Sequence, residues 1–444
     1  MVDDTDFGRE GASSLMEKVF RDPVHNLLGF DRERDRLVLD LIETSEIQRL
    51  RYIKLMGVSY IVYPGADHNR FSHSLGAAFL MKRIIERMQG LSRDRRFRLL
   101  VEEIQEYREI LLAAALLHDI GHFPLSHLLE SFTKEHHERW TSRLVAHPKG
   151  EVHQILKAQN RRYPRVIQEI IERTFKPSFA VKLISSQLDV DRMDYLLRDS
   201  YHTGVGYGKF DLEWLIHSLR ILEHEGDWEI AIDREKGLHA VESYVLARYY
   251  MYQQVYHHKT SRAAGVMVTQ ILKRAAELVK DGEVISPSES LCKLLIQPIR
   301  LTPEEFLQLD DVVLTYAIKE WSVCSDEILS DLCRRFLERR VFKTVEIEPE
   351  RYERVKGRLQ RIAKHKSFDP RYYLVLDTAV ADPYELFWRT DREVSESIYL
   401  VDPDLKLQEL SEHSELIRAI TNRRVARDRL CFPGELRQAI VPLI

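Results

Sequence analysis

An unbroken apolar segment that ends in a polar pair constrains this chain more than any other feature. Residues Ile110 to Leu117 carry only aliphatic side chains, and His118 and Asp119 follow directly. The segment is too short to cross a bilayer, which takes about 20 apolar residues. We therefore predict a helix of a water-soluble fold with the polar pair at its end, and we expect Gly121 to stop that helix.

Apolar residues recur at helical spacing along most of the chain. The pattern predicts helices over residues 73–88, 101–118, 152–156, 166–174, 179–197, 212–222, 238–280 and 307–338. Thr44 or Ser45 is a candidate N-cap for another helix. Short β-rich segments predict strands within 18–30 and at 228–232, 372–376 and 397–401. The expected fold is mainly α, with a small α/β C-terminal portion.

Three regions follow from these patterns. Residues 1–17 form a polar N-terminal tail that we expect to be frayed. Residues 18–285 form the main helical domain, and residues 286–444 form a C-terminal helical and α/β region. The boundary is placed near the Ser286-Pro287-Ser288 sequence.

The composition is that of an ordinary globular protein, with 44% hydrophobic residues and a net charge of -4. No overall positive field indicates nucleic-acid binding. The chain has 4 cysteines far apart in the sequence, which favours packing roles in a reducing compartment. The polar N-terminus is unlike a signal peptide. We expect a cytoplasmic protein with no membrane segment.

His118 and Asp119 combine an imidazole with a carboxylate, a mixture that suits Mn, Fe, Ni, Zn or Mg. Alone, such a pair is more often hydrogen-bonded than metal-bound. However, His73 stands upstream in a His-rich segment, and Asp191 stands downstream in an Asp-rich one. Two imidazoles and two carboxylates could enclose one divalent ion and leave positions open for water and phosphate. The pattern H…HD…D therefore predicts a divalent metal site.

Longer segments resemble the HD-domain superfamily, and within it the deoxynucleoside triphosphate (dNTP) triphosphohydrolase family of animals and bacteria. They are residues 46–54 (EIQRLRYIK), 63–71 (YPGADHNRF) and 118–127 (HDIGHFPLSH). The resemblance covers residues 18–280 and extends more loosely to 343. It implies an HD-domain helical fold and a homo-oligomer, a dimer or a tetramer.

The resemblance also implies roles for individual residues. The metal ligands would be His73, His118, Asp119 and Asp191. The catalytic group would be Arg70, His122, His127 and His137, with His127 as our candidate proton donor, because an imidazole titrates near neutral pH. Residues expected to bind the substrate are Arg192, Tyr195, Asp199, Arg248, Tyr252, Tyr256, His258 and Lys259.

Two positions depart from the family pattern. Leu55 stands where the animal enzyme has a glutamine that senses the sugar, and Tyr252 replaces a histidine near the base. Leucine cannot form a hydrogen bond, so sugar recognition would depend on Asp199 or another group. The base preference is therefore left open.

A regulatory nucleotide site is a further candidate. Lys18, Val19, Glu43 and Arg51 match family positions that bind an activating nucleotide, although Arg21 replaces an asparagine there. Surface charges and a salt bridge explain the same residues equally well.

The leading hypothesis is metal-dependent hydrolysis of dNTPs to a deoxynucleoside and inorganic triphosphate. One alternative is an HD-type phosphodiesterase or exonuclease that acts on single-stranded or cyclic nucleotides. Another is a catalytically silent nucleotide sensor. The intact quartet of ligands argues against the sensor, and the basic residues for a triphosphate argue against the phosphodiesterase.

Overall fold

We describe the protein from a computed structural model, which covers residues 17–93, 98–283, 288–381, 397–421 and 425–444. Nearly all of the predicted tail, and the predicted boundary around Pro287, lie outside these residues. The fold is mainly α, as predicted. No helix in the described ranges combines the length and apolar character that a membrane span requires.

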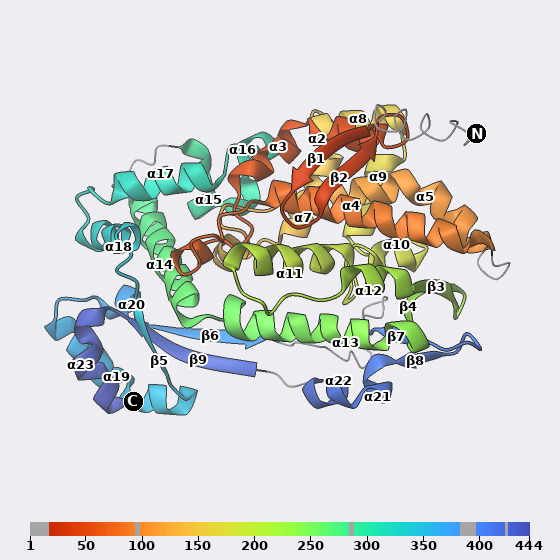
Figure 1. The fold of residues 1–444 in the computed structure, drawn as a ribbon. Coiled ribbons are helices and arrows are strands. Elements are labelled where there is room, and N and C mark those ends of the chain that lie inside the picture. The colour runs from red at the N-terminus through yellow and green to blue at the C-terminus, as the bar shows by residue number, and fades with distance from the viewer. Residues whose placement is uncertain (1–16, 94–97, 284–287, 382–396, 422–424) are drawn as a thin grey trace, which may run out of the picture.

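The helices form the main body of the molecule (Figure 1). Up to residue 281 they are α2 (Arg36–Ile42), α3 (Ser45–Arg49), α4 (Arg70–Gln89), α5 (Arg98–Leu117), α6 (His127–Thr133), α7 (His137–Ala146), α8 (Glu151–Gln159), α9 (Tyr163–Ile171), α10 (Ser178–Lys182), α11 (Val190–Thr203), α12 (Leu212–Ser218), α13 (Arg234–Met251) and α14 (Lys259–Asp281). The later helices are α15 (Glu289–Ile296), α16 (Pro303–Leu307), α17 (Asp311–Trp321), α18 (Glu327–Leu337), α19 (Pro349–His365), α20 (Pro370–Tyr373), α21 (Leu410–His413), α22 (Glu415–Ile420) and α23 (Arg437–Ile440).

The strands form small sheets at the edge of the helical body. They are β1 (Glu17–Asp22), β2 (Asn26–Asp31), β3 (Leu219–His224), β4 (Asp227–Asp233), β5 (Lys343–Glu346), β6 (Val375–Ala381), β7 (Tyr399–Val401), β8 (Leu407–Glu409) and β9 (Val425–Phe432). β1 and β2 pair as a hairpin, and the other sheets have the orders β3-β4-β7-β8 and β5-β9-β6. All pairings are antiparallel except the parallel pair β4 and β7.

The helices α4, α5 and α11 form the centre of the molecule. α4 packs against both of the others. Gly76 makes the contact with α11 close, because a Cβ atom at this position would lie 1.9 Å from Asp194 Oδ1. The apolar residues Leu111 to Leu117 of α5 are completely buried, as their composition requires. His73 lies on α4 and Asp191 on α11, and His118 and Asp119 directly follow α5.

Three predicted elements are shorter in the structure. The predicted helix 179–197 is broken, because Asp189 accepts a hydrogen bond from the backbone N–H of Arg192 and so begins α11. The predicted helix 212–222 ends at Ser218 and continues as β3, whose partner is β4. Residues 238–280 divide into α13, a π-helical turn over Tyr252–Tyr256, and α14.

One finer prediction is confirmed and two are wrong. Thr44 is the N-cap of α3. The predicted strand at 372–376 begins only at Val375, because residues 370–373 form α20 behind the N-cap Asp369. Gly121 does not end α5, which stops at Leu117. Instead, a Cβ atom on Gly121 would lie 2.2 Å from the backbone nitrogen of Thr141, so this glycine permits close packing against α7.

Candidate metal centre and nucleotide pocket

Hydrogen bonds orient the two histidines of the predicted metal site. His118 follows α5, and its Nδ1 lies 2.8 Å from the carbonyl oxygen of Ala115. His73 lies on α4, and its Nδ1 lies 2.7 Å from Asp194 Oδ2. In each ring the Nδ1 contact leaves Nε2 directed toward the carboxylates. Such outer contacts are the usual way in which metal-binding histidines are held.

The four predicted ligands meet at one point. His73 Nε2 lies 3.0 Å from Asp191 Oδ1 and 3.6 Å from Asp119 Oδ2. His118 Nε2 lies 3.4 Å from Asp119 Oδ1 and 3.7 Å from Asp191 Oδ1. Ligand atoms of His73, His118 and Asp119 all lie within 4.8 Å of one another. The arrangement brings nitrogen and oxygen donors from three helical segments around a small volume.

This quartet fits a divalent cation. The Nε2 atoms of His73 and His118 are buried and make no hydrogen bond, although buried polar atoms normally have a partner. Burial opposes charge on His73, but the close carboxylates of Asp191 and Asp194 raise its pKa to about 10. Burial opposes charge on Asp191 too, but the two histidines lower the pKa of that carboxyl. The carboxylates therefore require positive charge between them, and a bound cation would supply it.

A second cluster adjoins the first and centres on Glu130 of α6. Its Oε1 lies 3.2 Å from His122 Nδ1, 3.4 Å from His127 Nδ1 and 3.0 Å from His137 Nδ1. The rings of His122 and His137 stack with their centroids 3.9 Å apart. Glu130 thus joins all three histidines that the sequence predicted to be catalytic.

The surroundings of these three histidines differ. Burial, together with the positive charges of Arg70 and His137, lowers the pKa of His122 to about 3. Burial also opposes charge on His137, but its hydrogen bond to Glu130 raises the pKa. The side chain of His127 is 70% exposed. The cluster therefore offers a neutral imidazole in His122, an imidazole that favours its proton in His137, and an imidazole open to the cavity in His127.

Arg70 connects Asp119 to the loop that follows the HD pair. Its Nη1 donates to Asp119 Oδ2, and its Nε donates to Ser126 Oγ at 2.8 Å. The hydroxyl of Ser126 in turn donates to the carbonyl oxygen of Lys54 at 2.9 Å. Ser126 has a φ of 57°, an unusual value for a residue other than glycine. The loop that follows the HD pair is thus held in the conformation that orients Arg70.

A separate set of contacts surrounds Asp199. His68 Nε2 lies 2.7 Å from Asp199 Oδ1, and the hydroxyl of Tyr256 donates to Oδ2 at 2.8 Å. The rings of Tyr195 and Tyr256 meet edge to face at 6.3 Å. Asp199 is almost fully buried. A fixed carboxylate beside two aromatic rings suits the recognition of a small hydroxylated group.

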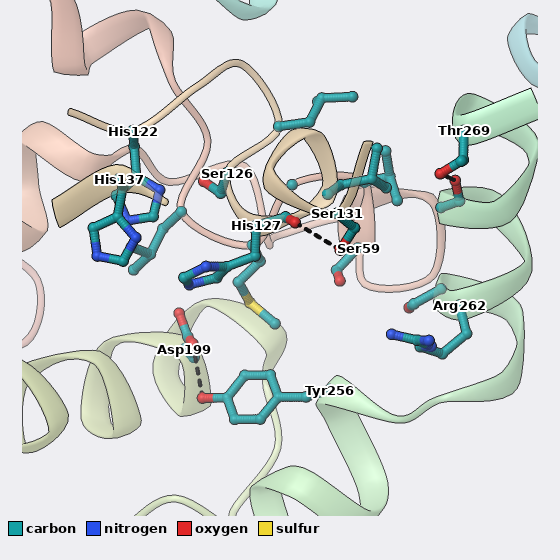
Figure 2. A pocket seen from close by; sticks show the side chains of 18 of the residues that line it. Ser59, His122, Ser126, His127, Ser131, His137, Asp199, Tyr256, Arg262 and Thr269 are labelled. Atoms are coloured by element: carbon teal, nitrogen blue, oxygen red, sulfur yellow. Dashed lines mark hydrogen bonds between the residues drawn. The ribbon is translucent and has the colours of Figure 1, made fainter. Parts of the chain in front are cut away.

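One cavity of about 690 Å³ connects these sets. Figure 2 shows His122 and His137 at one side and Asp199 with Tyr256 below them. Leu55 also lines the cavity. The predicted site residues on its wall are Arg70, His73, Asp119, His122, His127, His137, Asp191, Arg192, Tyr195, Asp199, Tyr252 and Tyr256.

Four predicted residues lie off this wall. His118 lies behind it among the metal ligands. Arg248 is buried and donates to Gln187 Oε1 at 3.2 Å. His258 is the N-cap of α14, and Lys259 is exposed at the first position of that helix. The substrate-binding roles of Arg248, His258 and Lys259 stay predictions.

The residues of the candidate regulatory site are only partly together. Lys18 and Glu43 form an ion pair at 2.5 Å on the surface. Val19 is exposed. Arg51 donates to Gln48 Oε1 at 2.7 Å, and its guanidinium lies 3.5 Å from the ring centroid of Phe71. The regulatory role stays a prediction.

Sequence reasoning gave no role to several residues that support the site. Glu130 lies three residues after His127 on α6, which places both on one face of that helix. His68 and Asp194 stand in the same motifs as His73 and Asp191. Asp311 of α17 accepts hydrogen bonds from the backbone nitrogens of Lys54 and Leu125, at 2.9 and 2.7 Å. Only the spacing of Glu130 from His127 was a usable signal in advance.

Comparison with known proteins agrees with this geometry. The HD domain model matches residues 70–199, and the HD associated region model matches residues 210–439. The uncharacterized protein YwfO of Bacillus subtilis is 38% identical over 95% of this chain and 93% of its own length. A phosphohydrolase structure from Bacteroides thetaiotaomicron has a TM-score of 0.76 and 28% identity, and the match covers 94% of this chain and 99% of that one.

A more distant relative carries a functional name. The deoxynucleoside triphosphate triphosphohydrolase SAMHD1 of Gallus gallus is 29% identical over 58% of this chain, and the match spans 45% of the chicken protein. Both family models and a full-length relative agree, and the structure brings the four predicted ligands together. The chain therefore belongs to the HD-domain family, carries the HD-associated region and is a metal-dependent phosphohydrolase.

Proposed function

We propose that this protein hydrolyses dNTPs to a deoxynucleoside and inorganic triphosphate. One observation carries the proposal: a single cavity joins three of the four proposed metal ligands, Arg70 and Arg192, and the aromatic site around Asp199. A nucleotide needs a metal ion and cationic groups for its phosphates, and a polar, aromatic surface for its sugar. The name of the chicken relative supports the same substrate class.

The phosphate chain would lie at the metal side of the cavity. Arg70 and Arg192 both line it and supply permanent positive charge. Each is already anchored: Arg70 to Asp119, and Arg192 to Asp189. Anchored guanidinium groups stabilise developing phosphate charge without having to reorganise during the reaction.

The proposed reaction breaks the bond between the α-phosphorus and the 5′ oxygen. His73, His118, Asp119 and Asp191 would hold the divalent cation, which supplies Lewis-acid stabilisation of phosphate charge when it is bound. A water molecule adds its oxygen to the α-phosphorus and gives up a proton. His127 transfers a proton to the departing 5′ oxygen, and the Glu130 cluster takes up the proton from water. The products are therefore a deoxynucleoside with a 5′ hydroxyl and intact triphosphate.

The sugar would lie against Tyr195 and Tyr256. Asp199 is held by His68 and Tyr256, and each carboxylate oxygen retains a lone pair for the sugar 3′ hydroxyl. Leu55 also lines the cavity, but its side chain cannot form a hydrogen bond to the sugar. We infer that Asp199 carries sugar recognition in this protein.

The identity of the products tests the proposal. Purified protein is incubated with each dNTP, each ribonucleotide and single-stranded DNA, in Mg²⁺ or Mn²⁺, and with a mixed dNTP pool in case an activator is needed. Phosphorus NMR then identifies the phosphate product. We expect triphosphate and free deoxynucleoside. Monophosphate with pyrophosphate would refute the proposed bond cleavage, mononucleotides from DNA would indicate the exonuclease, and no product would indicate the sensor.

A further inference from the structure

The cavity continues beyond the residues that the proposed function uses. Its far side is formed by α14 and by the start of β6. Figure 2 shows Arg262 across the cavity from His122 and His137, with Asp199 and Tyr256 between them. We call the polar residues of this side the distal wall; they are Ser261, Arg262, Thr269, Gln270 and Asp377.

Arg262 is oriented by a carboxylate on another element. Its Nε and Nη2 donate to the two oxygens of Asp377 at 3.0 and 2.5 Å. Asp377 is buried, whereas the side chain of Arg262 is 36% exposed. Among the described residues, Nη1 of Arg262 has no acceptor. The ion pair therefore fixes the guanidinium and leaves one donor nitrogen for a ligand.

Two further polar groups on the distal wall have no partner. Ser261 and Gln270 are 6% and 7% exposed, and neither Ser261 Oγ nor Gln270 Oε1 makes a hydrogen bond within the described chain. Buried polar atoms without partners are rare because they forfeit hydrogen bonds to water. Their place on the wall of the cavity that Arg262 also lines points to a polar ligand.

We propose that the distal wall binds the nucleobase of the substrate and that Arg262 selects a base with an oxo group. The inference rests on the proposed function, because phosphates at the metal side and sugar at Asp199 direct the base toward α14. Guanine and adenine have the same ring size but differ at position 6. The position-6 oxygen of guanine accepts a hydrogen bond from Arg262 Nη1. The position-6 amino group of adenine is itself a donor and cannot accept that hydrogen bond.

Discrimination between dGTP and dATP tests this inference. We expect kcat/KM for dGTP to exceed that for dATP by about 5- to 150-fold, the range for a polar base contact. Arg262→Ala should bring the ratio close to one, mainly through a higher KM for dGTP, while both substrates still release triphosphate. Arg262→Gln retains a hydrogen-bond donor, so it should keep part of the preference for dGTP. This variant therefore separates loss of the contact from a general folding defect.

A matched control lies on the same helix. Arg274 forms a similar two-point ion pair with Asp326, at 3.1 and 2.6 Å, but does not line the cavity. Arg274→Ala should leave the ratio of dGTP to dATP unchanged. A preference for dGTP that survives in Arg262→Ala, or no preference in the unmodified protein, overturns the inference.

A binding measurement separates this inference from the proposed function. Calorimetry with the α-thio analogues of dGTP and dATP reads base preference without turnover. If dNTPs are cleaved elsewhere than at the 5′ oxygen, the proposed function fails, but an Arg262-dependent preference in binding still supports the distal wall. Equal affinity for both analogues, or no binding of either, counts against the distal wall even if triphosphate is released.

Discussion

The histidines of the two clusters differ in where their Nδ1 atoms point. His73 and His118 use Nδ1 for orientation and present Nε2 to the carboxylates. His122 and His137 instead turn Nδ1 toward Glu130. We therefore expect the first two histidines to act as metal ligands and the other two as proton carriers, because the contacts of Nδ1 differ between the clusters.

Asp191 should be indispensable for metal binding. Asp191→Asn keeps the shape but replaces a charged oxygen ligand with a neutral amide, so we expect loss of bound metal and of turnover together. Elemental analysis of the purified variant, alongside the exposed control Asp404→Asn, measures this. Full metal content with normal turnover in Asp191→Asn would remove Asp191 from the ligand set.

Glu130 should set the pH range of activity. Its hydrogen bond raises the pKa of His137 despite burial, so Glu130→Gln should lower that pKa. If His137 holds the proton that His127 passes on to the 5′ oxygen, activity declines as pH rises through the pKa of His137. The alkaline limb of the kcat profile should therefore move to lower pH in Glu130→Gln, and kcat at neutral pH should fall by about 10²-fold.

The control for this variant is its metal content, measured on the same samples. Normal metal with a shifted alkaline limb supports a role in proton transfer. An alkaline limb that stays where it is in the unmodified protein would show that Glu130 does not set the protonation of the cluster.

Sequence reasoning reached the residues of the quartet but not their supports. The quartet stands in contiguous motifs, so its identity is readable from spacing and resemblance. Glu130 contacts His122 and His137 only because the fold brings the loop after the HD pair and the start of α7 to α6. The contact between His68 and Asp199 joins residues 131 positions apart. Such contacts are tertiary, and no local pattern encodes them.

At the scale of elements, helix caps and helix breaks determine where the functional side chains lie. Asp189 starts α11 two residues before Asp191, and the π-helical turn between α13 and α14 sets Tyr252 and Tyr256 on the cavity wall. Both features interrupt what the apolar pattern predicts as continuous helix. The pattern failed there because apolar spacing reports which face is buried, whereas caps and tertiary packing decide where a helix starts and stops.

α17 should stabilise the pocket through Asp311. Asp311→Ala removes two hydrogen bonds and leaves the backbone nitrogens of Lys54 and Leu125 unpaired. We expect the free energy of unfolding to fall by roughly 2–4 kcal/mol and kcat/KM to fall as well, because both loops border the cavity. The control is Asp310→Ala, which removes only the N-cap of α17 and should cost about 1 kcal/mol.

The contribution of Asp311 should depend on pH with a defined sign. Burial raises the pKa of Asp311 to about 6, above that of an exposed carboxyl, so the folded state holds this proton more tightly. Its contribution to stability is therefore greatest below about pH 4 and declines as pH rises through 6. The difference in unfolding free energy between the protein and Asp311→Ala should shrink over that range. A constant difference would contradict the raised pKa.

Across the whole molecule, one hydrophobic core holds side chains from both sides of the predicted boundary at residue 285. Phe306 stacks on Trp140 with centroids 4.2 Å apart, and the carbonyl oxygen of Leu309 accepts from Arg49. The parallel strand β7 pairs with β4. The sequence marks the boundary by a proline between serines, but it cannot show that the two regions pack as one.

This shared core leads to a prediction about truncation. A chain that ends at Glu283 lacks Phe306, Asp311 and β7, so it exposes the surfaces of Trp140 and β4 and loses the support of both pocket loops. We expect it to unfold without a cooperative transition and to bind no metal. The matched control is the full chain with a protease site inserted between Glu283 and Ser288. After cleavage both parts are present, and they should remain associated, folded and metal-bound. A truncated chain that unfolds cooperatively and holds its metal would instead show that residues 18–283 form an independent domain.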